Sequence, residues 1–241
     1  MLSHDPKYRH ELKYAISAAQ LPLLQLGVSP YVELDRYAEQ NGYYNVRSLY
    51  FDDYYNRYFY ESENGTDPRE KFRIRIYNHS TDRISLECKQ KERGKTLKAS
   101  CPLTLQEANI LMEGRCIPFS SDHPALLNKM NLEMRMHLLR PVVIVDYVRI
   151  PYVCKQGNVR ITFDMNISSS NRIQDFFCPQ LPKNPVMPVG QLLMEVKYDE
   201  YLPDVIYRSL NMDQAQPIAY SKYYLCRKYS RYIRRSNNVI F

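Results

Sequence analysis

The chain has 241 residues, and its 33 Lys and Arg against 26 Asp and Glu give a formal net charge of +7. That length allows a domain with a substantial core, and the positive charge favours a polyanionic partner: nucleic acid, anionic lipid or a phosphorylated small molecule. The six cysteines form no CxxC motif, and no apolar run suits a signal peptide or a membrane span. The sequence therefore predicts one soluble, cytosolic domain over residues 1–241.

The first half of the chain is predicted to alternate strands with short helices. Polar and apolar residues alternate, as in half-buried strands, at 8–16, 45–51, 69–77, 83–91 and 95–102. Capping boxes formed by Ser17 with Gln20 and by Thr104 with Glu107 predict helices after the first and fifth strands. Gly94 supplies the positive φ of a hairpin turn between the fourth and fifth strands.

The second half is predicted to add three strands and two helices. A helix from about Pro124 to Leu139 should end before Pro141. The strands are expected at 142–154, 158–164 and 192–199, and the basic, tyrosine-rich stretch 219–235 is predicted to be helical. Eight mainly antiparallel strands, charged on one face, predict an α+β fold: a closed eight-stranded barrel with a cationic interior and helices packed outside.

Charged residues recur at two-residue spacing in these strands, with apolar residues between them. The pairs are Glu11/Lys13, Arg73/Arg75, Glu87/Lys89 and Glu195/Lys197. Because successive side chains of a strand point to opposite faces, each segment is charged on one face and apolar on the other. A sheet with its charged face in water alternates in the same way, so the pattern alone leaves a solvated surface open. Four such pairs, mostly cationic, favour a shared anion site.

The predicted strand at 69–77 carries the densest series of cations. Its residues of one parity are Arg69, Lys71, Arg73 and Arg75. Four like charges in a row repel one another unless water or an anion neutralises them. Arg can grip phosphate oxygens with its planar fork, and Lys adds a compact charge, so phosphate is the anion that these residues favour.

Carboxylates are fewer than cations on the charged faces. They are Glu11, Glu87, Asp164 and Glu195. Each could pair with a neighbouring Lys or Arg, or could hold a divalent metal beside phosphate, as hard oxygen ligands do for Mg²⁺ or Mn²⁺. Glu195 is the expected metal ligand.

The ordered combination of these segments resembles a known family, the VTC domain. The matching segments are Arg9–Tyr14, Ser48–Asp52, Lys71–Tyr77, Leu86–Lys89, Tyr147–Arg149, Val159–Asp164, Glu195–Lys197 and Ser221–Tyr223. This family is the polyphosphate polymerase catalytic domain of the vacuolar transporter chaperone complex, and it has stand-alone bacterial relatives. The resemblance implies the triphosphate tunnel fold of the CYTH superfamily, whose basic lumen holds a nucleoside triphosphate or a phosphate chain.

The resemblance also implies roles for individual residues. Catalytic roles in binding and aligning phosphate fall on Lys13, Arg73, Arg75, Lys89, Arg149, Arg160 and Lys222. Substrate-binding roles fall on Lys98, Tyr147 and Ser221, and Lys71 and Lys197 join them because they share the charged faces. Glu195 falls on the metal-binding position, which would take Mn²⁺ or Mg²⁺.

One position departs from the wider superfamily, whose first strand carries an ExExK signature. Arg9 stands where the first Glu would be, and this favours a polymerase over a two-metal hydrolase. The leading hypothesis is an ATP-dependent polyphosphate polymerase that passes the γ-phosphoryl group of ATP to a growing chain. The alternatives are a triphosphatase acting on inorganic triphosphate, a nucleotide or an RNA 5′ end, and a non-catalytic binder of polyphosphate or RNA.

ATP and polyphosphate are the expected partners of the chain, and no specific nucleic acid is expected. Any coupling to a membrane would need a separate membrane protein as partner.

Overall fold

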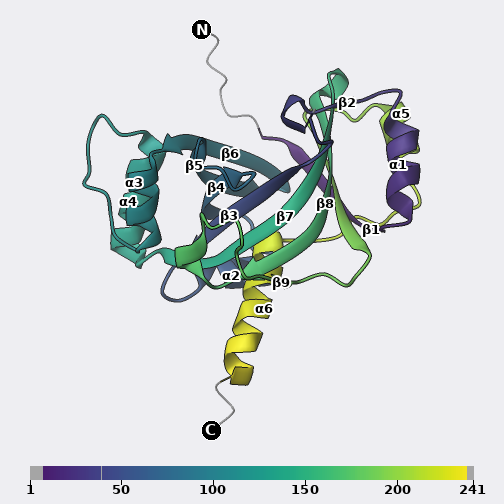
Figure 1. The fold of residues 1–241 in the computed structure, drawn as a ribbon. Coiled ribbons are helices and arrows are strands. Elements are labelled where there is room, and N and C mark those ends of the chain that lie inside the picture. Colours follow the sequence, from purple (N-terminus) through teal and green to yellow (C-terminus); the bar gives the residue numbers. More distant parts are fainter. Residues whose placement is uncertain (1–7, 39, 238–241) are drawn as a thin grey trace.

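The computed structural model describes residues 8–38 and 40–237. Its centre is one curled antiparallel sheet with the strand order β1-β10-β8-β7-β3-β4-β5-β6 (Figure 1). The strands are β1 (His10–Ser17), β3 (Tyr44–Asp52), β4 (Arg69–Tyr77), β5 (Ile84–Glu92), β6 (Lys95–Leu103), β7 (Arg140–Cys154), β8 (Val159–Ser170) and β10 (Gln191–Tyr198). Two short strands lie off this path: β2 (Glu33–Leu34) pairs with β7, and β9 (Asn184–Pro185) pairs with β8.

The sheet curls far enough to bring its two edges together at one point. Arg9, just before β1, and Thr96 of β6 exchange two backbone hydrogen bonds of 2.9 Å. The predicted α+β class is confirmed, with an eight-stranded half-barrel as its frame.

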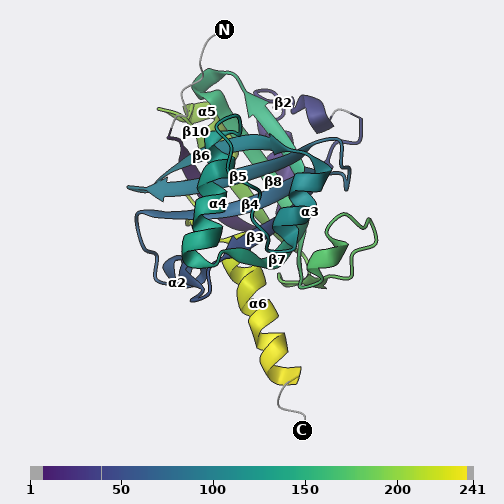
Figure 2. The same cartoon turned by 90° about the vertical axis from the view of Figure 1, so that its left-hand side faces the viewer.

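The convex side of the sheet carries the larger hydrophobic core. In β4, Phe72, Ile74 and Ile76 are fully buried, as the alternation predicts. Two helices, α3 (Leu105–Met112) and α4 (Ala125–His137), cover this part of the sheet (Figure 2). Burial of each such side chain stabilises the fold by about 1.5–3 kcal/mol.

A second hydrophobic core lies at the other end of the sheet. There α1 (Gln20–Val28) and α5 (Asp204–Ser209) pack beside each other over β1, β8 and β10 (Figure 1). The helices bury Val28 and Ile206 against Ile161 and Val196 of the sheet. Both cores leave the opposite face of the strands to polar residues.

The predicted helix starts are confirmed to different degrees. At α3, Thr104 and Glu107 form the full reciprocal capping box, with hydrogen bonds of 3.2 Å and 2.7 Å to each other's backbone N–H. Ser17 and Gln20 exchange the same type of bonds, but α1 begins only at Gln20, so this box stabilises the turn before the helix. The predicted hairpin glycine is confirmed, since Gly94 has φ of +77°.

Several short elements escaped prediction. They are α2 (Arg57–Glu63), α5, β2, β9 and three 3₁₀ turns at Arg36–Ala38, Gln156–Asn158 and Ile173–Asp175. The basic C-terminal stretch forms α6 (Lys222–Asn237), which starts against the strands and runs away from the sheet (Figure 1). Among the described helices, none combines the length and the apolar character needed to cross a membrane.

Candidate functional site

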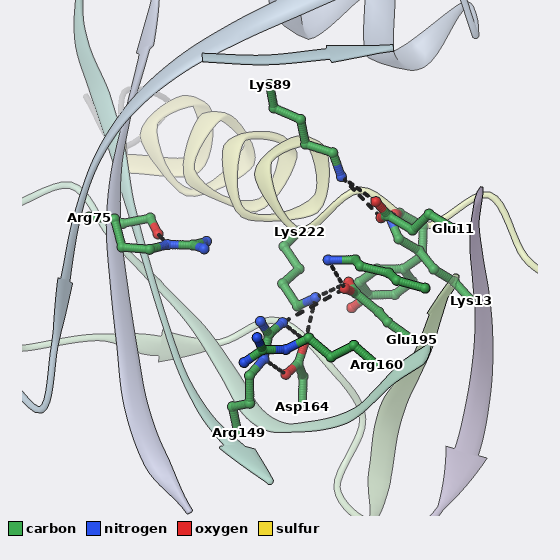
Figure 3. Close-up of polar contacts among 12 residues, drawn as sticks. Glu11, Lys13, Arg75, Lys89, Arg149, Arg160, Asp164, Glu195 and Lys222 are labelled. Carbon is green, nitrogen blue, oxygen red and sulfur yellow. Dashed lines mark hydrogen bonds and ion pairs between the residues drawn. The ribbon is translucent and has the colours of Figure 1, made fainter. Parts of the chain in front are cut away.

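Charged side chains from both ends of the sheet meet on its concave side. Lys89 of β5 reaches Glu11 of β1 with Nζ to Oε2 at 2.8 Å, although these strands are not hydrogen-bonded neighbours. Figure 3 shows the same convergence for residues of β1, β5, β7, β8, β10 and the first residue of α6. The alternation predicted from the sequence therefore brings the charged faces to one place.

Glu87 is the centre of a first cluster on β4, β5 and β6. Strand pairing sets it opposite Arg73, whose Nη2 lies 2.6 Å from the carboxylate. Arg75 lies at 3.6 Å and Lys98 at 3.1 Å from the same group. Burial alone would raise the pKa of Glu87, but the three cations hold it below its usual value. One carboxylate thus balances three cations.

Lys222 of α6 is the centre of a second cluster. Its Nζ lies 2.5 Å from Oε1 of Glu195 and 2.6 Å from Oδ2 of Asp164. Arg149 forks onto Asp164 with bonds of 2.6 Å and 2.7 Å, and Lys197 lies 3.3 Å from Glu195. Burial would raise the pKa of Glu195, but Lys222 and Lys197 hold it well below its usual value, so the group is a carboxylate at neutral pH.

The segment that precedes α6 explains how a helix delivers a lysine into the sheet. The backbone N–H of Ile218 donates to the carbonyl of Lys13 at 2.8 Å, and the Lys13 ammonium donates to the carbonyl of Tyr220 at 2.7 Å. The aromatic ring of Tyr147 lies 5.1 Å below the ammonium of Lys222 and adds a cation–π contact. β1 and β7 therefore fix the start of the helix.

Glu11 joins β1 to β5 in a third cluster. Its carboxylate lies 2.9 Å from Lys13 and 2.8 Å from Lys89. Burial lowers the pKa of the Lys89 ammonium to about 7, with Glu11 opposing the shift and Lys13 and Lys197 adding to it. Lys89 is therefore poised to gain or lose its charge near neutral pH.

Three predicted site residues, Arg160, Lys71 and Ser221, lie outside the three clusters. Arg160 pairs with Asp35 at 2.8 Å and donates to the Tyr44 hydroxyl at 2.9 Å. Lys71 donates to the hydroxyls of Ser62 and Ser221 at 2.7 Å and 3.3 Å. The other predicted site residues belong to the three clusters, Tyr147 through its ring contact with Lys222.

Several side chains that support the cations were not predicted from the sequence. Tyr50 and Ser48 of β3 accept hydrogen bonds from Arg73 and Arg75 at 2.7 Å and 3.0 Å. The alternation of residues along β3 could have predicted both, because Ser48 and Tyr50 flank Leu49 and therefore share the opposite face of the strand. Asp35 and Tyr44 had no such signal: Asp35 lies outside the predicted strands, and Tyr44 precedes the predicted start of its strand.

The departure from the hydrolase signature has a structural counterpart. Arg9, in place of the first Glu, forms an ion pair with Asp199 at 2.8 Å and donates to the carbonyl of Asn158. It therefore ties the start of β1 to the start of β8 and the end of β10, and it adds no carboxylate to the concave side.

The carboxylates of the site suit a metal ion that is shared with phosphate. In the described part of the chain, no group of three or more His, Cys, Asp or Glu side chains is arranged to hold a metal by itself. Glu195 and Asp164 do converge, since both contact Lys222. Mg²⁺ in phosphate sites is commonly held by one or two carboxylates, with phosphate oxygens and water completing the shell, so this donor set fits such an ion.

The fold and the site define a class of protein: an α+β half-barrel with clustered cations and carboxylates on the concave face of its antiparallel sheet. The model of the VTC domain family matches residues 8–230. The chain therefore belongs to the VTC domain family.

Solved structures of low sequence identity are similar to the chain. A Hippeastrum protein described as a putative adenylyl cyclase with a dominant triphosphatase activity has 13% identity and a TM-score of 0.51, over 91% of this chain and 95% of that one. The PH1819 protein of Pyrococcus horikoshii has 17% identity and a TM-score of 0.45, over 90% and 97% of the two chains. A putative adenylate cyclase of Bacillus halodurans has 13% and 0.48, over 86% and 88%. No curated protein sequence matches the chain.

Proposed function

We propose that the chain is an ATP-dependent polyphosphate polymerase, which transfers the γ-phosphoryl group of ATP to the end of a growing phosphate chain. Membership of the VTC domain family supports this assignment. The observation that carries it is the excess of cations on the concave face, where each carboxylate is shared by two or more Lys or Arg side chains. Such an excess suits a ligand with many charges.

The proposed lumen is the space enclosed by the concave face. Closure of the barrel at the β1 and β6 edges is part of the proposal, and the bridge between Arg9 and Thr96 supports it. A polyanion inside would replace the water that otherwise separates like charges, and the low dielectric of a dry interior would strengthen each contact.

The site residues would act by alignment and charge neutralisation, because phosphoryl transfer has a loose transition state with charge spread over its oxygens. Arg73, Arg75 and Arg149 would donate to phosphate oxygens with the guanidinium N–H groups that their carboxylate partners leave free. Lys89 and Lys222 would neutralise charge that develops between the donor and the acceptor. None of the steps requires a nucleophilic side chain.

Glu195, with Asp164 beside it, would hold Mn²⁺ or Mg²⁺. When bound, the ion supplies charge neutralisation to the donor phosphates. Lys222 contacts both carboxylates, so in the proposal its ammonium shifts toward phosphate when the ion binds.

ATP and polyphosphate are the proposed ligands, and a separate membrane protein is the proposed partner for any membrane coupling.

The test is to incubate the purified protein with ATP and Mn²⁺ or Mg²⁺ and to separate the products by gel electrophoresis. Phosphate chains are expected, and Arg73→Ala or Glu195→Ala is expected to reduce their formation by about 100-fold or more, as loss of a transition-state contact does. Lys95→Ala, on the exposed β5–β6 hairpin, is the control that should leave synthesis unchanged. Retained synthesis in either site variant would contradict the assigned roles.

A triphosphatase is the second candidate. The Hippeastrum structure of the same fold is described as having a dominant triphosphatase activity, and the same cations could hold a triphosphate with water as acceptor. Free phosphate in place of chains would establish this activity. Binding of polyphosphate without turnover under every metal would leave a binding module.

A further inference from the structure

Strand pairing places three lysines side by side on β4, β5 and β6. Lys71 lies opposite Lys89, and Lys89 lies opposite Lys98, so all three occupy one row on one face. Directly opposite residues in a sheet have Cβ atoms about 4.5–5.5 Å apart, and like charges at that separation repel each other. An ion pair with Glu11 offsets this repulsion at Lys89, and an ion pair with Glu87 offsets it at Lys98. Within the described residues, Lys71 has no such ion pair.

The surroundings of Lys71 consist of hydroxyl groups and an aromatic ring. Its ammonium donates to Ser62 of α2 at 2.7 Å and to Ser221, just before α6, at 3.3 Å. It also lies 5.0 Å from the centre of the Tyr223 ring. Within residues 8–38 and 40–237, no carboxylate forms an ion pair with it. An ammonium that is partly removed from water and lacks a counter-ion is costly to hold.

The nearby carboxylates are occupied or distant. Asp52 lies close enough to favour the charged form of Lys71, but its oxygens accept hydrogen bonds from the Tyr223 hydroxyl at 2.5 Å and from backbone N–H groups of α2. The charge of Lys71 favours the ionised form of Glu61 and so acts to lower the pKa of that group, but the two side chains form no ion pair among the described residues. Burial, with Arg69 and Lys89 adding to it, lowers the pKa of Lys71 well below its usual value.

The two hydroxyls make this position suitable for an anion. A serine hydroxyl can rotate, so Ser221 can turn its hydrogen toward a phosphate oxygen that approaches the Lys71 ammonium. Ser62 donates its hydrogen to the Tyr58 carbonyl at 2.6 Å, and it can donate to phosphate only by giving up that bond. Ser221 is also the residue before Lys222, which belongs to the Asp164 and Glu195 cluster. An anion at Lys71 therefore lies next to the central cations, and a chain of linked phosphates could occupy both places at once.

We propose that Lys71, with the hydroxyls of Ser62 and Ser221, forms an additional phosphate subsite that binds units of a linear phosphate chain beyond those held by the central clusters. The inference rests on the proposed function in that it assumes a polyphosphate ligand. It adds that the chain is selected by length: a ligand of three phosphates fills the central cations, and a longer one also reaches Lys71.

The test measures binding without turnover, in the presence of a chelator, so its result does not depend on whether ATP is polymerised. Dissociation constants are measured by calorimetry for inorganic triphosphate and for long-chain polyphosphate. Lys71→Gln is expected to weaken the long chain by about tenfold or more, as the loss of one charge-assisted contact does, and to leave triphosphate within about twofold. Lys95→Gln removes the same charge from the exposed hairpin and should change neither value.

Two further variants distinguish the loss of charge from a folding defect. Lys71→Met keeps the aliphatic stem beside Tyr223 and should show the same length-dependent loss, whereas Lys71→Arg, which keeps the charge, should restore most of the long-chain affinity. Thermal unfolding checks that each variant is folded. An equal loss for both ligands, no loss for either, or an equal effect of Lys95→Gln would overturn the inference. Failure of the polymerase assay alone would leave these binding results standing.

Discussion

At the scale of single residues, the site holds cations that are only partly neutralised, and one of them, Lys89, can lose its charge near neutral pH. Burial lowers the pKa of its ammonium to about 7, although it lies 2.8 Å from Glu11. Below that pH the side chain is charged. As the pH rises through 7, the free protein loses this charge, so its attraction for an anion falls.

Lys89→Arg should flatten this dependence, because a guanidinium stays charged across the neutral range. We expect the polyphosphate affinity of the wild-type protein to fall between about pH 6 and pH 8, and that of the variant to fall less. Calorimetry without metal at matched ionic strength measures both. Titration of the ligand affects both proteins alike and cancels in the comparison. Identical profiles would show that Lys89 does not set the pH dependence.

Residue identities predicted the face of each charge but not its partner. The alternation of Phe72, Ile74 and Ile76 with cations predicted the bounds of β4 as the structure has them. Alternation cannot give register, so the pairing of Arg73 with Glu87 needed the three-dimensional structure. The same holds for Asp35, which pairs with Arg160 from outside the eight strands and has no periodic neighbour.

At the scale of elements, α2 and α6 are tied to the end of β3 through one buried carboxylate. Asp52 accepts hydrogen bonds from the backbone of Tyr58 at 2.9 Å and from the Tyr223 hydroxyl at 2.5 Å. The seven residues of α2 are too few for a helical period to be recognised, which is why the sequence did not predict it. The placement of α6 follows from contacts that are distant in sequence.

Tyr223→Phe should weaken this junction. The variant loses one hydrogen bond to a charged acceptor while keeping the ring, so we expect the free energy of unfolding to fall by about 1–3 kcal/mol. Urea denaturation gives the value. Tyr229→Phe, at an exposed position of the same helix, should change stability by less than about 0.5 kcal/mol. Equal effects of the two variants would show that Asp52 does not anchor α6.

At the scale of the whole molecule, the cations of the concave face oppose folding when no anion is present, because like charges are held close together. A ligand that binds only the folded state stabilises it by mass action, by about 2.7 kcal/mol at a concentration 100 times its dissociation constant. For a domain of this size that corresponds to a rise in Tm of about 5–10 °C.

Long-chain polyphosphate should therefore raise the Tm, and added salt should reduce the effect by screening. Differential scanning fluorimetry measures the shift at each salt concentration, with the ionic strength matched between samples with and without polyphosphate. Polyglutamate of similar charge is the control: its carboxylates lack the geometry of phosphate and should give a smaller rise. If the two polyanions acted equally, the site would be responding to charge alone.

The edge strand β6 has a further consequence for the protein in solution. Apart from its ladder with β5 and the bridge at Thr96, its outer backbone groups have no strand partner among the described residues. Such an edge can template pairing with a second molecule, and natural sheets prevent this with lysines and prolines. β6 carries Lys95, Lys98 and Pro102, all exposed. Lys98, a predicted phosphate ligand, therefore also protects the edge against aggregation.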